Sequence, residues 1–259
     1  MSLLDAVLER YRQCGSLHCA GALFILDPES GEPRGPARGL EIWHGDKTNW
    51  RVQVAAASAN GAGNNLSTAI VDGRTEYMQT AKNYMAMPSS MSGFWTRIYT
   101  KAISDVFMPL ISDSWKLPVI GAFNPEMAQL VVSPDGRMVA VNTYKTCQIS
   151  LTLDVENLKI DEVSAFHAVD PAQLGAGFAV APIHNAMAEQ TEDEQKDRNK
   201  ALYKALVSGG GRVANAEDVF PRRVVFRIDS TNFDSPMQDS LFKPSGAEIQ
   251  MSQMLKGMS

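Results

Sequence analysis

The stretch AIVDGRTEY, residues 69–77, decides how this chain is expected to fold. Asp72-Gly73 supplies the positive φ angles of a tight turn, and β-rich runs at residues 68–71 and 75–80 flank it. Strands that are joined by so short a turn pair antiparallel. The stretch therefore predicts an antiparallel hairpin.

Further β-rich runs extend this hairpin into a meander. Turn residues separate the runs, so we expect consecutive runs to pair antiparallel as well. The runs of this meander before the hairpin lie at residues 23–26, 40–43 and 50–54. Further strands are predicted at residues 130–133, 138–144, 148–153 and 222–229.

Two apolar helical patterns accompany these strands. Ser2 is a suitable helix cap with Asp5 three positions later, and the predicted helix ends near Gly15. Its apolar face consists of Leu3, Leu4, Val7, Leu8 and Tyr11. Residues 91–111 carry apolar side chains at helical spacing and predict one or two short helices, interrupted by Pro109. Both patterns need an apolar surface to pack against, which a sheet would supply.

Residues 154–211 show no such clear pattern. The stretch 154–182 mixes proline, glycine and apolar residues, and we expect it to be irregular. Residues 189–204 place acids before bases and predict a solvated helix that stops before the glycines at 209–211. We therefore expect a single domain over residues 1–259, with an insertion or irregular extension at 154–211.

Composition excludes several classes of protein. The 259 residues are 44% hydrophobic and 20% charged, which is typical of a globular protein with a packed core. A net charge of −5 leaves no basic excess for binding nucleic acid. The sequence has no run of about 18 apolar residues to span a membrane, and no signal peptide. We expect a soluble protein, either untargeted or the mature part of an exported one.

The sequence lacks motifs for catalysis, metal binding or cofactor binding. Its four histidines have no metal-ligand spacing, its serines no G-x-S-x-G elbow, and its glycine clusters no phosphate-binding lysine. Cys14, Cys19 and Cys147 indicate no zinc site, although a bond between Cys14 and Cys19 is open. His44 with Asp46 is a candidate acid–base pair, against the alternative of an ordinary surface turn. No metal and no cofactor is therefore predicted.

The unusual feature of the composition is its soft apolar content, with 13 methionines and four tryptophans. Methionine adapts its shape both to irregular cores and to promiscuous apolar pockets. A curved sheet with a helix across its mouth encloses a cavity that suits apolar ligands. Binding of an apolar ligand is predicted, with plain core packing as the alternative for any single methionine.

Three local patterns resemble the LolA/LolB-like lipoprotein carriers, and they occur in the same order as in that family. The hairpin at 69–77 is similar to the carriers' V-S-D-G-K-T-L-W hairpin, and residues 39–43 with 49–52 resemble the strand pair before it. Residues 232–233 followed by 241–248 resemble the closing F-x-x-P-x-G-x-x-V pattern. The chain departs from the family at His44-Gly45, where the carriers have an Arg-Pro pair that helps regulate opening of the cavity.

The resemblance implies an α+β fold, in which a strongly curved antiparallel sheet forms a half-open β-barrel and helices cover its concave face. It also implies a non-enzymatic transport protein of the periplasm or cell envelope, with a lipid, an acyl chain or a lipoprotein anchor in the cavity. The N-terminal helix and residues 91–111 would act as a lid. By strand position and family pattern, the expected wall of the cavity consists of Trp43, Trp50, Val52, Val54, Ile70, Tyr77 and Met108.

Two other hypotheses stay open. In the first, the sheet has a filled core, carries no lipid and binds a protein partner such as an envelope regulator. In the second, the chain is an enzyme that uses His44 with Asp46.

Overall fold

The structure of the chain is a computed structural model that describes residues 2–45, 48–55, 66–73, 75–80, 82–87, 93–100, 103–111, 123–143, 147–167 and 222–249. Its strands are β1 (Ser16–Leu26), β2 (Arg38–Gly45), β3 (Asn49–Ala55), β4 (Leu66–Asp72), β5 (Thr75–Gln79), β6 (Asn83–Ala86), β7 (Gln129–Val132), β8 (Met138–Thr143), β9 (Cys147–Asp154), β10 (Lys159–His167), β11 (Arg222–Phe233) and β12 (Ala247–Glu248). Its helices are α1 (Leu3–Gln13), α2 (Phe94–Tyr99) and α3 (Ser104–Ile111), with the short 3-10 helices η2 (Pro125–Met127) and η4 (Asp239–Phe242).

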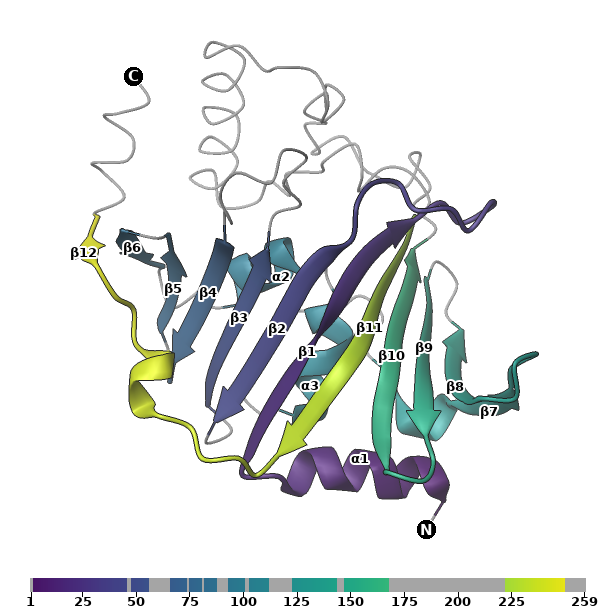
Figure 1. The fold of residues 1–259 in the computed structure, drawn as a ribbon. Coiled ribbons are helices and arrows are strands. Elements are labelled where there is room, and N and C mark those ends of the chain that lie inside the picture. The colour runs from purple at the N-terminus through teal and green to yellow at the C-terminus, as the bar shows by residue number, and fades with distance from the viewer. Residues whose placement is uncertain are drawn as a thin grey trace.

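The described strands form one curved, open sheet in the order β12-β6-β5-β4-β3-β2-β1-β11-β10-β9-β8-β7. All neighbours pair antiparallel except β12, which runs parallel to β6. The predicted hairpin is confirmed as β4 and β5, and it belongs to a meander that runs from β1 to β6. A second meander runs from β7 to β11, and the pairing of β1 with β11 joins the two at the middle of the sheet (Figure 1).

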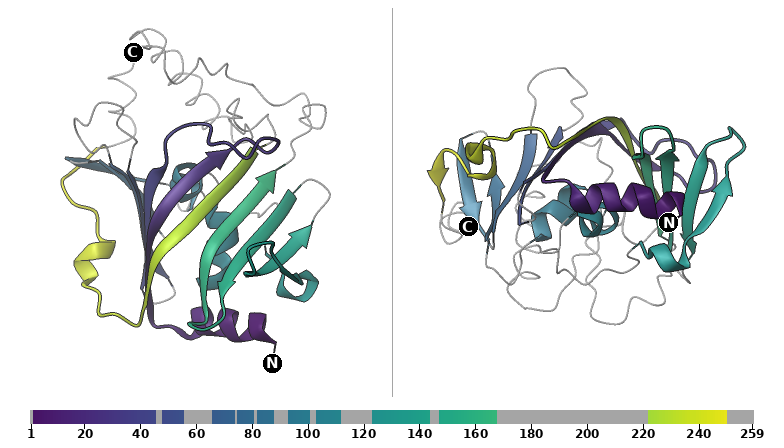
Figure 2. Two further views of the ribbon diagram at one scale, coloured as in Figure 1. Left: turned by 45° about the vertical axis from the view of Figure 1, so that its right-hand side comes forward. Right: turned by 90° about the horizontal axis from the view of Figure 1, so that it is seen from below.

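The three helices pack against one face of the sheet, which we call the inner face (Figure 2). Alternate residues of the strands point toward them, as expected for a pleated strand with one face on the core. Fully buried members of this core include Leu17 of β1, Ile42 of β2, Ile149 of β9 and Phe226 of β11. Both meanders therefore contribute to a single apolar core.

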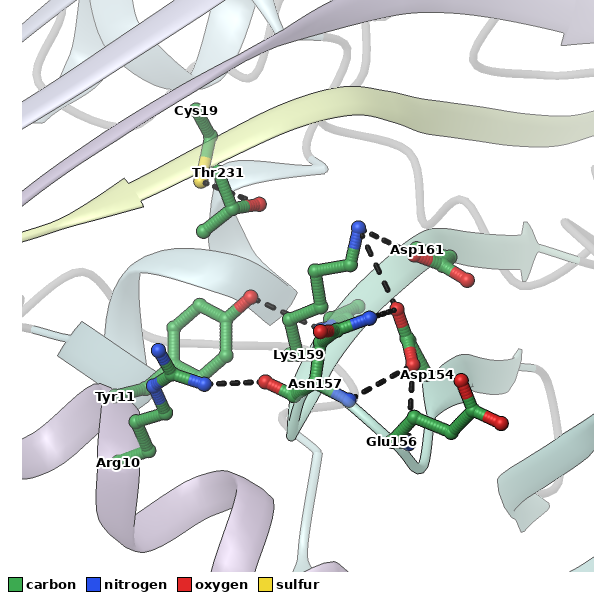
Figure 3. Close-up of polar contacts among 10 residues, drawn as sticks. Arg10, Tyr11, Cys19, Asp154, Glu156, Asn157, Lys159, Asp161 and Thr231 are labelled. Carbon is green, nitrogen blue, oxygen red and sulfur yellow. Dashed lines mark hydrogen bonds and ion pairs between the residues drawn. The ribbon is translucent and has the colours of Figure 1, made fainter.

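Helix α1 forms as its sequence predicts and is fastened to the strands beside it. Ser2 and Asp5 form a reciprocal capping box, and Leu4, Val7, Leu8 and Tyr11 are the buried face. The Tyr11 hydroxyl accepts a hydrogen bond of 3.0 Å from the backbone N–H of Ile160 in β10 (Figure 3). The Tyr11 ring meets Phe107 of α3 and Phe233 of β11 edge-on, with centroids 6.0 and 5.1 Å away. Helix α1 thus ties β10, β11 and α3 together.

The turn between β9 and β10 is held by its own polar contacts and is bonded to α1. Asp154 accepts hydrogen bonds from the backbone and side chain of Asn157, and Lys159 lies 3.5 Å from both Asp154 and Asp161 (Figure 3). This arrangement presents the Asn157 carbonyl to the guanidinium of Arg10. The turn and the helix therefore hold each other in place.

The predictions for three strands, β1, β10 and β11, were wrong in where the strands lie or end. Residues 159–167 form β10 in the middle of the sheet, although the stretch 154–182 was expected to be irregular. The strand β1 begins seven residues before the predicted start at 23, and β11 runs beyond 229 to Phe233. The rest of that irregular stretch, and the solvated helix predicted at 189–204, lie outside the described residues.

Register shifts explain the two strand errors in the C-terminal half. The pairing of β10 with β9 shifts between Ile160 and Glu162, and that of β11 with β1 shifts opposite Ala20 and Gly21. An extra residue at such a bulge breaks the alternation of apolar and polar residues from which strands are predicted. In β11 the break in the pattern was therefore mistaken for the end of the strand, whereas in β10 it obscured the start of a strand that was not predicted.

We predict that Gly21→Ala will destabilise the protein by about 1–3 kcal/mol. A Cβ at residue 21 would lie only 2.0 Å from the backbone oxygen of Arg227, so the central pair of strands would have to separate locally. Gly39→Ala is the matched control on β2, because its Cβ would meet that of Ala55 at an ordinary 3.5 Å. Urea unfolding of both variants tests this, and equal stability would contradict it.

Candidate functional site

Four of the seven predicted wall residues lie together on the inner face. Trp50, Val52 and Val54 of β3 and Met108 of α3 are at most 3% exposed and belong to the same core cluster. Phe107 and Met108, together with Ile103 just before α3, pack against the strands. The inner face of the described residues is thus apolar and already packed by side chains.

The other three predicted wall residues, Trp43, Ile70 and Tyr77, lie on the opposite face, which we call the outer face. Trp43 pairs across the strands with Arg51, Arg51 with Ile70, and Ile70 with Tyr77. Residues directly opposite each other in antiparallel strands share one face. The seven residues therefore do not surround one common space.

A polar cluster on the inner face holds the start of α2. Glu76 of β5 is fully buried and accepts hydrogen bonds from the backbone N–H groups of Trp95 and Thr96, at 3.1 and 2.9 Å. Its carboxylate also accepts a bond of 2.8 Å from the Thr96 hydroxyl, which in turn accepts one of 3.3 Å from the Trp50 indole. Burial of the carboxylate raises the pKa of Glu76, and the bonds from Thr96 and Trp95 oppose that rise.

A pocket of about 490 Å³ lies on the outer face, between the sheet and the segment of residues 234–249, which we call the strap. The sheet side of this outer pocket is formed by His18 of β1, Trp43 of β2, and Arg51 and Gln53 of β3. The strap side is formed by Ser235, Pro236, Met237, Gln238, Ser240 and Leu241. The strap lies on the opposite side of the sheet from the helices (Figure 2).

The strap is fixed at both of its ends. At its start, Asp234 accepts a bond of 2.7 Å from the backbone N–H of Gly15, and the Ser16 hydroxyl donates one of 2.7 Å to the Ser235 carbonyl. At its far end, β12 pairs with β6 at the edge of the sheet (Figure 1). Between these points Phe242 is buried over Gly45, where an added Cβ would lie 2.9 Å from the ring.

Arg51 is the central group of the outer pocket. One of its terminal nitrogens donates a hydrogen bond of 3.2 Å to the Leu241 carbonyl of the strap, and its guanidinium lies 5.9 Å from the centre of the Trp43 ring. Trp43 is also stacked on His18, with ring centres 4.9 Å apart and planes 7° apart. Burial lowers the pKa of Arg51, although a guanidinium remains charged at any physiological pH.

The buried Nε donor of Arg51 has no hydrogen-bond partner within the part of the chain that the structure describes. A buried donor without an acceptor costs about 1–3 kcal/mol. The Glu41 carboxylate lies 3.2 Å from His18, and its charge also opposes the lowering of the Arg51 pKa. The outer pocket thus contains a fixed cation with unused donors.

Sequence reasoning named Trp43 but missed His18, Arg51 and Gln53 of this pocket. The available signal was the alternation of β3: if Trp50, Val52 and Val54 face the core, then Arg51 and Gln53 must face outward together. No sequence signal places the strap over them.

The other candidate groups offer little chemistry. His44 is fully buried on β2, and Asp46, its proposed acid–base partner, lies outside the described residues. The open question of a bond between Cys14 and Cys19 is answered, because all three thiols are free and buried. Within the described ranges no cluster of three or more metal-ligating side chains occurs, and no helix is long and apolar enough to cross a membrane.

Comparison with known proteins gives matches among solved structures only, since no family model and no curated protein matches the sequence. The structure is similar to LolA-superfamily proteins. A LolA superfamily protein from Nitrosomonas europaea matches with 10% identity over 93% of this chain and 96% of that chain, at a TM-score of 0.32. A putative outer membrane lipoprotein-sorting protein domain from Vibrio parahaemolyticus matches with 8% identity over 93% and 95%, also at 0.32. A DUF1329 family protein from Desulfovibrio piger matches with 8% identity over 93% and 95%, at 0.35.

We predict that none of the three thiols reacts quickly with Ellman's reagent at about pH 8 in the folded protein. Burial raises the pKa of Cys19 to about 12 and that of Cys147 to about 11, and it also raises the pKa of Cys14. All three thiols should react once denaturant is added. Ser240→Cys, at an exposed position, is the positive control, and fast labelling of the unmodified protein would show that a native thiol is accessible.

We predict that Glu76→Gln will reduce the dependence of stability on pH. Because the pKa of Glu76 is raised in the folded state, the folded protein binds more protons than the unfolded chain above the ordinary value of 4.5. The free energy of unfolding should therefore fall as pH rises through this range, and the variant should lose that part of the slope. Urea unfolding between about pH 4 and 8 measures how the free energy of unfolding changes with pH, and Glu29→Gln is the exposed control. The same change with pH in all three proteins would contradict the prediction.

Proposed function

We propose that this chain is a non-enzymatic binding protein that holds an apolar ligand, such as an acyl chain or lipid, in a half-barrel formed by the inner face of the sheet with α2 and α3 as its cover. The observation that supports this most is the continuity of the apolar inner face across both meanders, from Val52 of β3 to Leu151 of β9. Its cover includes two short helices of only 6 and 8 residues. Burying an acyl chain there would contribute roughly 25 cal/mol for each Å² removed from water.

The two covering helices differ in how they are attached. Helix α2 is bonded to the sheet through Thr96, Glu76 and Trp50, whereas α3 meets it with the side chains of Phe107 and Met108. Apolar contacts can be exchanged for contacts with a ligand of similar chemistry, while a buried hydrogen bond that is broken leaves its groups unsatisfied. In this proposal α2 stays on the sheet, and α3 moves to admit the ligand.

The sequence patterns shared with lipoprotein carriers support a place in the periplasm or cell envelope. They also support a lipid, an acyl chain or a lipoprotein anchor as the cargo.

A second candidate function is a protein-interaction module that carries no lipid. The observation in its favour is the dense packing of the inner face, where Ile103, Phe107 and Met108 are fully buried. Under this alternative the sheet is a scaffold, and an envelope protein would bind to its surface.

A pair of tryptophan variants tests the proposal. Trp50 faces the inner core and Trp43 the outer pocket, so a brominated fatty acid bound inside should quench the fluorescence of Trp50 by contact and leave that of Trp43 unchanged. We predict saturable quenching that persists in Trp43→Phe and is substantially reduced in Trp50→Phe. Both substitutions keep an aromatic ring, so circular dichroism should report an intact fold.

The contrary results separate the alternatives. Quenching that is lost only in Trp43→Phe would place the fatty acid on the outer face and overturn the proposal. Absence of saturable quenching, together with no lipid in an organic extract analysed by mass spectrometry, would favour the protein-interaction module.

A further inference from the structure

We propose that the outer pocket is a second binding site, in which Arg51 binds the carboxylate or phosphate group of a small polar organic molecule beneath the strap. The outer pocket lies on the opposite side of the sheet from the apolar inner face, so this inference is independent of the proposed function.

Arg51 has unused hydrogen-bonding capacity. A guanidinium has five N–H donors in one plane. One terminal nitrogen donates to the Leu241 carbonyl, and the buried Nε has no acceptor among the residues that the structure describes. A ligand oxyanion that reaches this edge of the guanidinium would supply the missing acceptor, as in bidentate arginine–carboxylate and arginine–phosphate pairs.

Arg51 is already held in position in the folded protein. Its own strand pairing places it between Trp43 and Ile70, and the strap carbonyl fixes one end of the guanidinium. Since the side chain is held in the folded protein, a ligand loses less binding energy in ordering it. A long cationic side chain on an open strand would have no such restraint.

The charges around the outer pocket also favour an anionic ligand. Glu41 is the neighbouring carboxylate on the outer face, and it lies against His18 at 3.2 Å. No carboxylate of the described residues forms an ion pair with Arg51. A ligand that brings its own negative charge would therefore meet a cation that is not already neutralised by contact.

The size and lining of the outer pocket suit a small polar organic molecule. Its volume of about 490 Å³ exceeds what a bare anion needs and falls in the range of small-molecule sites. Gln53 on the sheet side, and Gln238 and Ser240 on the strap side, offer amide and hydroxyl groups. These groups suit the polar remainder of an organic phosphate or carboxylate better than an acyl chain.

The test is calorimetric titration of the full-length protein with glycerol 3-phosphate and with succinate, at a constant ionic strength set by sodium chloride. We expect saturable binding at one site for at least one probe, and a weakening of about tenfold or more in Arg51→Gln. Arg227→Gln is the matched control, because Arg227 lies on the outer face of β11 and beside Glu162, away from the outer pocket. This control should bind as the unmodified protein does.

A second variant keeps the test decisive if Arg51→Gln folds poorly. Gln53→Glu leaves Arg51 in place and adds a negative charge to the lining, so it should also weaken binding of the probes. Thermal unfolding of each variant reports its folding. An equal loss of binding in Arg51→Gln and Arg227→Gln would overturn the site.

A parallel arm distinguishes a free molecule from a lipid headgroup as the source of the oxyanion. The protein is sedimented with vesicles of phosphatidylglycerol in phosphatidylcholine, and with vesicles of phosphatidylcholine alone. Binding that requires both phosphatidylglycerol and Arg51 assigns the site to a headgroup, while binding of the soluble probes alone assigns it to a free metabolite. Failure of both arms rejects the proposal without affecting the fatty-acid test of the inner face.

Discussion

The pairing of β1 with β11 is the interaction on which the rest of the structure depends. It joins the meander of the N-terminal half to that of the C-terminal half and makes one sheet of them. It also brings together residues as distant in sequence as Gly15 and Asp234, which are 219 positions apart. Closing so long a loop costs entropy before any contact forms, so the long ladder of β1 and β11 has to offset it. Without this ladder neither the inner core nor the outer pocket would exist.

The two candidate sites are consequences of the same strand geometry. Successive residues of β3 point to opposite faces, so Trp50 and Val52 enter the apolar core while Arg51 lies in a polar pocket one residue away. The proposed apolar ligand among the helices and the proposed anionic ligand beneath the strap would therefore contact opposite faces of one strand. The sheet separates the two environments, and each can be altered by substitution without exposing the other.

The polar cluster at Glu76 fixes the position of α2 on strands that it otherwise meets through apolar contacts. Apolar side chains alone would let α2 slide over the strands, whereas the bonds from Trp95 and Thr96 to one buried carboxylate fix the position of its first turn. Burial makes the charged form of that carboxylate costly, and the surrounding donors reduce the cost. The cluster thus fixes the start of α2 on the sheet.

The sequence by itself determined the elements whose stability is local. The capping box of α1 and the Asp72-Gly73 hairpin were predicted from the sequence, because each depends on residues a few positions apart. It also determined the inward-facing residues of β3 by alternation, although it assigned Trp43, Ile70 and Tyr77 to the same wall. Only the tertiary structure decided the full lengths of β1 and β11 and the course of β10, because bulges there interrupt the local pattern. It alone decided that the strap covers Arg51, since this contact joins Arg51 to Leu241, 190 positions away, and no local preference of either segment specifies the other.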